Sequence, residues 1–174
     1  MKGFKINLIA EDEDLKEKIY RKLTELDSLD IKQELEAAGK YQADFEATLT
    51  NGDKGKVIIY TTSNQFRFKN SLILDSIKKL NSSYIAFELS NQKNWEEIRS
   101  LLENTPELDK KVLTHPIMLA GNLTEGKERK VNQQDIDTLV NRYGIKYYEI
   151  CVETGNNVKE SIDYLYDQMR LAQS

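Results

Sequence analysis

Apolar and polar residues follow two different rhythms along this chain. Densely apolar runs at 4–10 and 84–89 have the length of buried strands, whereas other segments carry apolar residues every three or four positions, as at Leu15, Ile19 and Leu23. The full pattern predicts strands at 4–10, 44–50, 56–62, 84–89, within 112–121 and at 145–151, and helices that carry the apolar stripes 15–26, 73–80, 95–102, 136–143 and 158–169.

A short polar link joins the second and third expected strands. It contains Asn51-Gly52, a strong signal for a tight β-hairpin, so the second strand should run antiparallel to the third. Elsewhere the alternation of strands and helices predicts a parallel sheet. No repeat and no linker rich in proline or glycine divides the chain. We therefore expect one α/β domain over residues 1–174, with a six-stranded, mostly parallel sheet, one antiparallel edge strand and helices on both faces.

Composition narrows the class of protein. The net charge of −4 and the lack of a Lys/Arg stripe argue against nucleic-acid binding. The single cysteine, Cys151, excludes an internal disulfide and fits a reducing compartment. No apolar stretch approaches the roughly 20 residues of a membrane span, and no cysteine near the end could carry a lipid. We expect a cytoplasmic protein without a membrane anchor of its own.

The turn after the first strand has the spacing of a phosphate-binding loop. Such loops read G-x-x-x-x-G-K-[S/T], because glycines let backbone N–H groups approach the phosphates. Here Ala10 and Leu15 take the glycine positions, Glu17 takes the hydroxyl position, and only Lys16 is retained. The four acids at 11–14 would repel a polyanion, since two like charges about 4 Å apart cost about 1 kcal/mol in water and about 4 kcal/mol at an effective dielectric near 20.

Further motifs identify a family by resemblance. Residues 60–68 resemble the W-D-T-A-G-Q-E-R-F motif of small GTPases, and residues 43–45 resemble V-D-F of the Rab effector segment. Residues 88–91 resemble D-V-T-N, 120–125 resemble V-G-N-K-x-D, and 149–155 resemble E-T-S-A-K-T-G. From end to end the chain resembles a Ras-superfamily small GTPase, most similar to the Rab branch. The resemblance implies a P-loop NTPase-type fold.

The resemblance also implies a nucleotide site, but most of its chemistry is replaced. The magnesium ligands correspond to Glu17, Lys40 and Thr61, of which the lysine would repel the metal. At the base, Asn122 is retained, and Glu125 replaces an aspartate. The degenerate site comprises Ala10, Leu15, Lys16, Glu17, Thr61, Asn64 in place of a glycine, Gln65 at the water-positioning glutamine, Asn122, Glu125, and Cys151 and Glu153 in place of the S-A-K serine and lysine.

Aromatic residues gather in the part of the chain that corresponds to the effector face. An exposed aromatic cluster rimmed by basic residues suits a protein interface. The alternative is that most of them are core residues beneath a remodelled switch. The candidate interaction surface comprises Tyr41, Phe45, Tyr60, Phe66 and Phe68.

These observations favour a Rab-like pseudo-GTPase that neither binds nor hydrolyses GTP productively. On this interpretation it is not an enzyme, needs no cofactor or metal, and binds protein partners through the switch-like face, in trafficking or a multi-subunit assembly. One alternative is a divergent guanine-nucleotide switch that uses Lys16, Asn122 and Glu125. A second alternative is a divalent-metal regulatory site at the acidic loop 11–14, although a solvated loop in which Asp14 caps the first helix explains such a run more simply.

Overall fold

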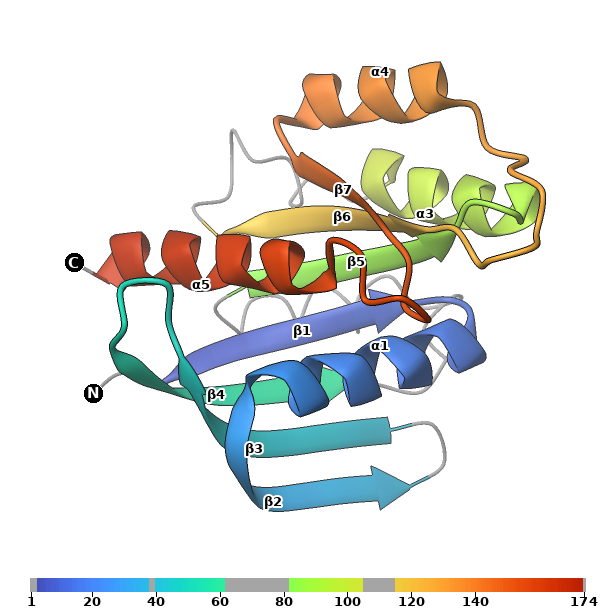
Figure 1. Ribbon diagram of the computed structural model, residues 1–174. Coiled ribbons are helices and arrows are strands. Elements are labelled where there is room, and N and C mark those ends of the chain that lie inside the picture. Colours follow the sequence, from blue (N-terminus) through green and yellow to red (C-terminus); the bar gives the residue numbers. More distant parts are fainter. Residues whose placement is uncertain (1–2, 38–39, 62–81, 105–114, 174) are drawn as a thin grey trace.

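The computed structural model describes residues 3–37, 40–61, 82–104 and 115–173. These residues form a sheet with helices on both of its faces (Figure 1). The strands are β1 (Phe4–Ala10), β2 (Ser28–Ala37), β3 (Lys40–Thr48), β4 (Lys54–Thr61), β5 (Ser82–Glu88), β6 (Ile117–Asn122) and β7 (Lys146–Ile150). The helices are α1 (Glu13–Asp27), α3 (Gln92–Glu103), α4 (Gln133–Tyr143) and α5 (Val158–Gln173). Among the described residues, no helix combines the length and apolarity that a membrane crossing requires.

The sheet confirms the predicted fold class and carries one strand more than expected. Its order is β2-β3-β4-β1-β5-β6-β7, and all neighbouring pairs from β4 to β7 are parallel. Strand β3 is antiparallel to both β4 and β2. The sequence predicts six strands with the reversed strand at the edge. In the structure β2 pairs outside it, so the described sheet has seven strands and the reversed strand lies one place in from the edge.

Two cores lie on opposite faces of the sheet. On one face α1 and α5 cover the sheet, with Leu8 of β1, Ile19 of α1 and Leu165 of α5 all fully buried (Figure 1). On the other face Ile9 and Phe87 lie in one cluster with Trp95 of α3 and residues of α4. Because β1 contributes to both cores, it is apolar nearly throughout, as a central parallel strand must be.

The hairpin predicted at Asn51-Gly52 is confirmed. Strands β3 and β4 pair antiparallel from Gln42 opposite Tyr60 to Thr48 opposite Lys54. Gly52 has a φ of +88°, in the left-handed region that favours glycine, and its N–H donates to the carbonyl of Leu49 at 2.9 Å. The helix expected to carry the stripe 73–80 lies outside the described residues.

Candidate functional site

The connection from β1 to α1 is too short to be a phosphate-binding loop. It consists of Glu11 and Asp12, and the helix begins at Glu13. Asp12 caps the helix: its Oδ1 accepts a hydrogen bond from Leu15 N, and its carbonyl accepts one from Lys16 N, both at 3.0 Å. The expectation that Asp14 is the cap is therefore wrong, since Asp14 forms an ion pair with Lys18 at 3.0 Å instead.

The two positions of the missing glycines lie in the hydrophobic core. Ala10 is 6% exposed and Leu15 is 1% exposed, and both belong to the cluster beneath α1 and α5. Leu15 thus anchors the first turn of α1 to the sheet. In this turn the backbone N–H groups of Leu15 and Lys16 both donate to Asp12, so neither is available to a phosphate.

Lys16 is buried and paired within the chain. Only 1% of its side chain is exposed, and its Nζ lies 3.1 Å from Glu13 Oε1 and 3.0 Å from Glu13 Oε2. Burial lowers the pKa of Lys16, and the hydrogen bond and charge of Glu13 oppose that shift. The one basic residue retained from the phosphate-loop pattern therefore already has an anionic partner. Glu17, at the position of the magnesium hydroxyl, is exposed.

The base-recognition segment is also held by bonds within the protein. Asn122 is fully buried at the end of β6, where its Nδ2 donates to Glu88 Oε1 at 2.9 Å. Its Oδ1 accepts from Val152 N at 3.0 Å, which ties β6 to the loop after β7. Asn122 therefore links three segments at the carboxyl edge of the sheet.

The other residues of this segment lie nearer the surface. Glu125 is exposed. Cys151 is half-buried, and its thiol donates to the exposed carboxylate of Glu153 at 3.3 Å. A glutamate therefore lies where the resemblance places a lysine beside the base.

Glu88 lies between the base-recognition segment, to which it is hydrogen-bonded, and Asp12 at the start of α1. Its second carboxylate oxygen accepts from Thr124 Oγ1 at 3.3 Å, and Asp12 is close enough to act on its charge. Burial raises the pKa of Glu88, the hydrogen bond from Asn122 lowers it, and the charge of Asp12 raises it again. The sequence gives no direct sign of this role, because Glu88 approaches Asn122 only when β5 and β6 pair in register.

The raised pKa of Glu88 predicts a specific pH dependence of stability. The folded state binds the Glu88 proton more tightly than the unfolded state, so this contribution is fully present below the unfolded pKa and is lost as pH rises through the folded pKa. As the pH rises above about 4.5, the unfolding free energy of the wild type should therefore fall relative to that of Glu88→Gln, which does not titrate at this position. Urea titrations at several pH values measure this difference. A pH-independent difference would contradict the prediction.

The switch-like residues divide between the core and the surface. Thr61 is buried, and its Oγ1 accepts from Tyr41 N at 2.7 Å. Phe45 is fully buried, so it lies in the core rather than on an interaction surface. Tyr41 is half-buried with its ring 5.1 Å from that of Tyr20, and Tyr60 is half-buried on β4. Lys40 begins β3. Asn64, Gln65, Phe66 and Phe68 lie outside the described residues.

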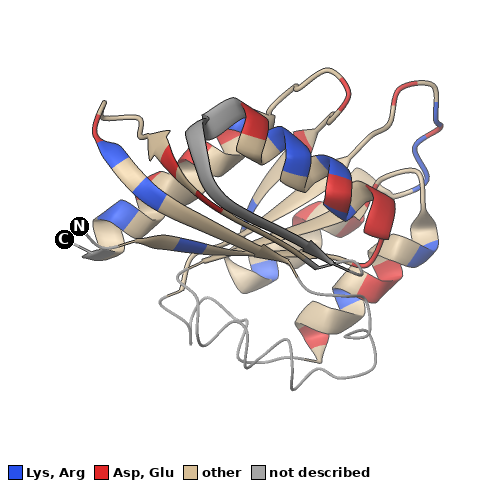
Figure 2. Cartoon of the chain, turned by 90° about the horizontal axis from the view of Figure 1, so that it is seen from below, with Lys and Arg blue, Asp and Glu red and all other residues tan. Residues whose placement is uncertain are grey.

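The acids of the 11–14 segment do not converge on one point. Asp12 caps α1, Glu13 contacts Lys16 and Asp14 contacts Lys18. Within the described part of the chain, no group of three or more His, Cys, Asp or Glu side chains could hold a metal ion. Both signs of charge are interspersed along the helices (Figure 2). The geometry gives no support to the metal-site alternative.

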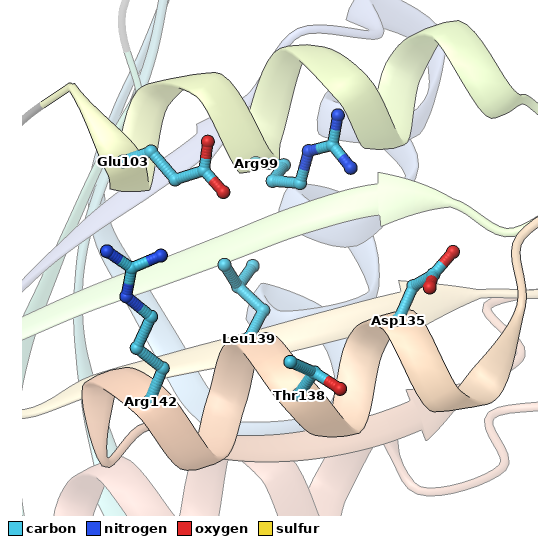
Figure 3. A pocket seen from close by; sticks show the side chains of 6 residues that line it. All are labelled: Arg99, Glu103, Asp135, Thr138, Leu139 and Arg142. Atoms are coloured by element: carbon cyan, nitrogen blue, oxygen red, sulfur yellow. The ribbon is translucent and has the colours of Figure 1, made fainter.

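A separate groove lies between α3 and α4 (Figure 3). Arg99 and Glu103 point into it from α3, and Arg142 and Leu139 point into it from α4. Arg99 already forms an ion pair with Glu96 on its own helix. The groove shares no residue with the site at the carboxyl edge.

The family follows from the match of the whole chain. Residues 6–171 match the Ras family. The chain belongs to the Ras family. One relative is the Ras-related protein Rab-27B of Homo sapiens, which is 26% identical over 129 residues. The match covers 71% of this chain and 58% of that protein. Another is Rab-37 of Mus musculus, 28% identical over 110 residues that cover 63% of this chain and 48% of that protein. This Ras-family chain thus spans about half the length of the curated relatives it matches.

Membership in this family corrects one expectation from the sequence. The chain was expected not to be an enzyme, but Ras-family proteins and their Rab relatives are GTPases, which are hydrolases. That expectation is wrong at the level of the family. The observed side chains nevertheless fit a magnesium-bound nucleotide poorly. Lys16 is paired with Glu13, and the backbone N–H of Leu15 donates to Asp12. Glu17 stands where the family has a hydroxyl group.

Proposed function

We propose that this Ras-family protein is a Rab-like interaction module with weak affinity for guanine nucleotides. One observation supports it most directly. Two polar residues retained from the family's nucleotide motifs, Lys16 and Asn122, are both bound by carboxylates of this chain, Glu13 and Glu88. A nucleotide would have to displace the first carboxylate and lie beside the second.

The cost of that displacement is large on the scale of binding energies. A carboxylate left about 4 Å from a phosphate charge costs about 4 kcal/mol at an effective dielectric near 20, and each 1.4 kcal/mol is about tenfold in affinity. Asp12, Glu13 and Glu88 all lie at or beside the site. Together they support an affinity orders of magnitude below that of a tight nucleotide complex.

The interaction role rests on the β3–β4 side of the sheet. Tyr60 is half-buried on β4, on the face that also carries the ion pairs of Lys56 with Asp44 at 3.8 Å and of Lys54 with Glu46 at 3.6 Å. Tyr41 lies on the opposite face, against Tyr20 of α1. An aromatic ring beside charged side chains suits a protein interface. We propose a protein partner on this side, within a trafficking or multi-subunit assembly in the cytoplasm.

Thermal stability with and without nucleotide tests the weak-affinity proposal. A ligand present at about 100 times its Kd stabilises a protein by about 2.7 kcal/mol, which raises Tm by roughly 5–10 °C in a chain of this size. With about 1 mM GTP and excess magnesium, we expect a shift of less than about 1 °C, because the lysine that would bind a phosphate is already paired with Glu13. A shift of several degrees would contradict the proposal.

The second candidate is a divergent guanine-nucleotide switch. It is favoured by the positions of Lys16 in the first turn of α1 and Asn122 at the end of β6, both at the carboxyl edge of the sheet. Magnesium-dependent stabilisation by GTP, together with phosphate release from GTP, would support this candidate. Loss of both on Lys16→Met would assign the effect to this site.

A further inference from the structure

The tip of the β3–β4 hairpin carries a dipeptide that can react with itself. Asn51-Gly52 is the only place in the sequence where a glycine follows an asparagine. Both residues are exposed, and no described atom lies within 4 Å of the point where a Cβ would stand at Gly52. Asparagine side chains are thermolabile. A following glycine has no Cβ to hinder the approach of its backbone nitrogen to the asparagine side chain.

We propose that Asn51 is a site of spontaneous deamidation, and that a hydrogen bond to Asp53 slows this reaction in the folded protein. The backbone nitrogen of Gly52 loses its proton to solvent and attacks the side-chain Cγ of Asn51. The new N–Cγ bond closes a succinimide ring, and the Cγ–Nδ2 bond breaks as ammonia leaves with a proton from solvent. One water molecule then opens the ring at either carbonyl, which yields aspartate or isoaspartate.

Hydrogen bonds within the hairpin tip oppose this attack. The N–H of Gly52 donates to the Leu49 carbonyl at 2.9 Å, which disfavours loss of its proton. The Asn51 amide is held by a single residue, since its Nδ2 donates to Asp53 Oδ2 at 3.0 Å and its Oδ1 accepts from Asp53 N at 3.1 Å. Such local bonds are typical of asparagine in turns. Ammonia can leave only after the bond from Nδ2 to the Asp53 carboxylate has broken.

Deamidation would alter the hairpin at a defined point. An aspartate at position 51 places a second carboxylate where the amide now donates to Asp53, and like charges at that separation repel. An isoaspartate carries the main chain through the former side chain and lengthens the tip by one methylene group. The preceding residue, Thr50, donates to Asp167 of α5, so the altered tip adjoins the contact between the hairpin and that helix.

The chain contains a matched control for the reaction. Asn132 is also exposed, and its Oδ1 accepts from Gln134 N at 2.8 Å. The residue that follows it is Gln133, whose side chain hinders the attacking nitrogen. The two asparagines therefore differ mainly in the residue that follows, and both can be measured in one digest of one sample.

The test measures deamidation rates in full-length protein kept in mildly alkaline buffer. Tryptic peptides are quantified by mass spectrometry for the wild type, Asp53→Ala and Asp53→Asn, and for the wild type unfolded in urea. Asp53→Asn keeps a side-chain oxygen that can accept from Asn51 Nδ2 but removes the charge. Because residue 53 is exposed, circular dichroism should show both variants folded.

We expect the rate at Asn51 to rise about three- to tenfold in Asp53→Ala and by less than about twofold in Asp53→Asn, because only the first loses a hydrogen bond. Unfolding in urea should raise it further, and the products should include isoaspartate. Asn132 should react more slowly than Asn51 in the unfolded chain.

Three results would overturn the proposal. An unchanged or lower rate in Asp53→Ala, or an equal rise in both variants, would remove the role of the Asp53 hydrogen bond. Unfolded chains in which Asn51 reacts no faster than Asn132 would show that residue 51 is not a preferred site. Aspartate without isoaspartate at position 51 would exclude the succinimide route.

Discussion

Phe45→Ala is expected to lower the free energy of unfolding by about 3–5 kcal/mol, the usual cost of truncating a buried phenylalanine. Phe45 is fully buried on β3, in the cluster that α1 and α5 cover. Its strand neighbours on the same face, Ala43 and Ala47, are small and cannot fill the cavity. Guanidinium denaturation followed by tryptophan fluorescence measures the loss.

Lys56→Ala is the control for this prediction. Lys56 lies on the adjacent strand, with its side chain 55% exposed, and its removal should change stability by no more than about 0.5 kcal/mol. The reverse pattern, in which Phe45→Ala leaves stability unchanged but abolishes binding to a partner, would return Phe45 to the interaction surface.

Asn122→Ala is expected to lower the free energy of unfolding by about 2–4 kcal/mol in the absence of any nucleotide. Truncation removes the donor to Glu88 and the acceptor for Val152 N, and it leaves the buried amide of Val152 unpaired. Each buried group deprived of its partner costs about 1–3 kcal/mol. The measurement is again equilibrium denaturation of the unliganded protein.

A role of Asn122 in ligand recognition alone predicts a different result. In that case the unliganded variant would be as stable as the wild type, which contradicts the structural role. Glu125→Ala provides the comparison within the same motif, since Glu125 is exposed and its loss should fall within about 0.5 kcal/mol.

The architecture could be predicted from the sequence because its signals are local. The stripe through Trp95, Ile98 and Leu102 predicts α3, and the apolar run of β1 predicts a strand buried on both faces. The Asn51-Gly52 turn predicts the hairpin by the conformational freedom of glycine alone. Each of these features requires only neighbouring residues.

Strand β2 was not predicted, although its sequence carries a signal. Leu29 and Ile31 alternate with Asp30 and Lys32, as in a strand with one apolar face. The strand follows α1 directly, without a glycine or proline to mark the boundary. Its register with β3 also shifts between Ser28 and Gln33, which interrupts the period of two.

The closure of the nucleotide site could be predicted only in part. The acids of the 11–14 segment predict repulsion of a polyanion, but not which carboxylate contacts which group. The pairing of Glu13 with Lys16 follows from their spacing of three residues on a helix, once the helix is known to begin at Glu13. The bond from Asn122 to Glu88 spans 34 residues and depends on the pairing of β5 with β6.

The outermost position of β2 bears on how the protein behaves at high concentration. A terminal strand of ten residues offers its free backbone groups to any other chain, and long flat edges of this kind nucleate aggregates. Here the sequence of the strand contains three acids and one base, Asp30, Glu34, Glu36 and Lys32, and its register with β3 is irregular. Copies that meet edge to edge would bring an excess of acidic residues together, which favours a dispersed protein over fibres.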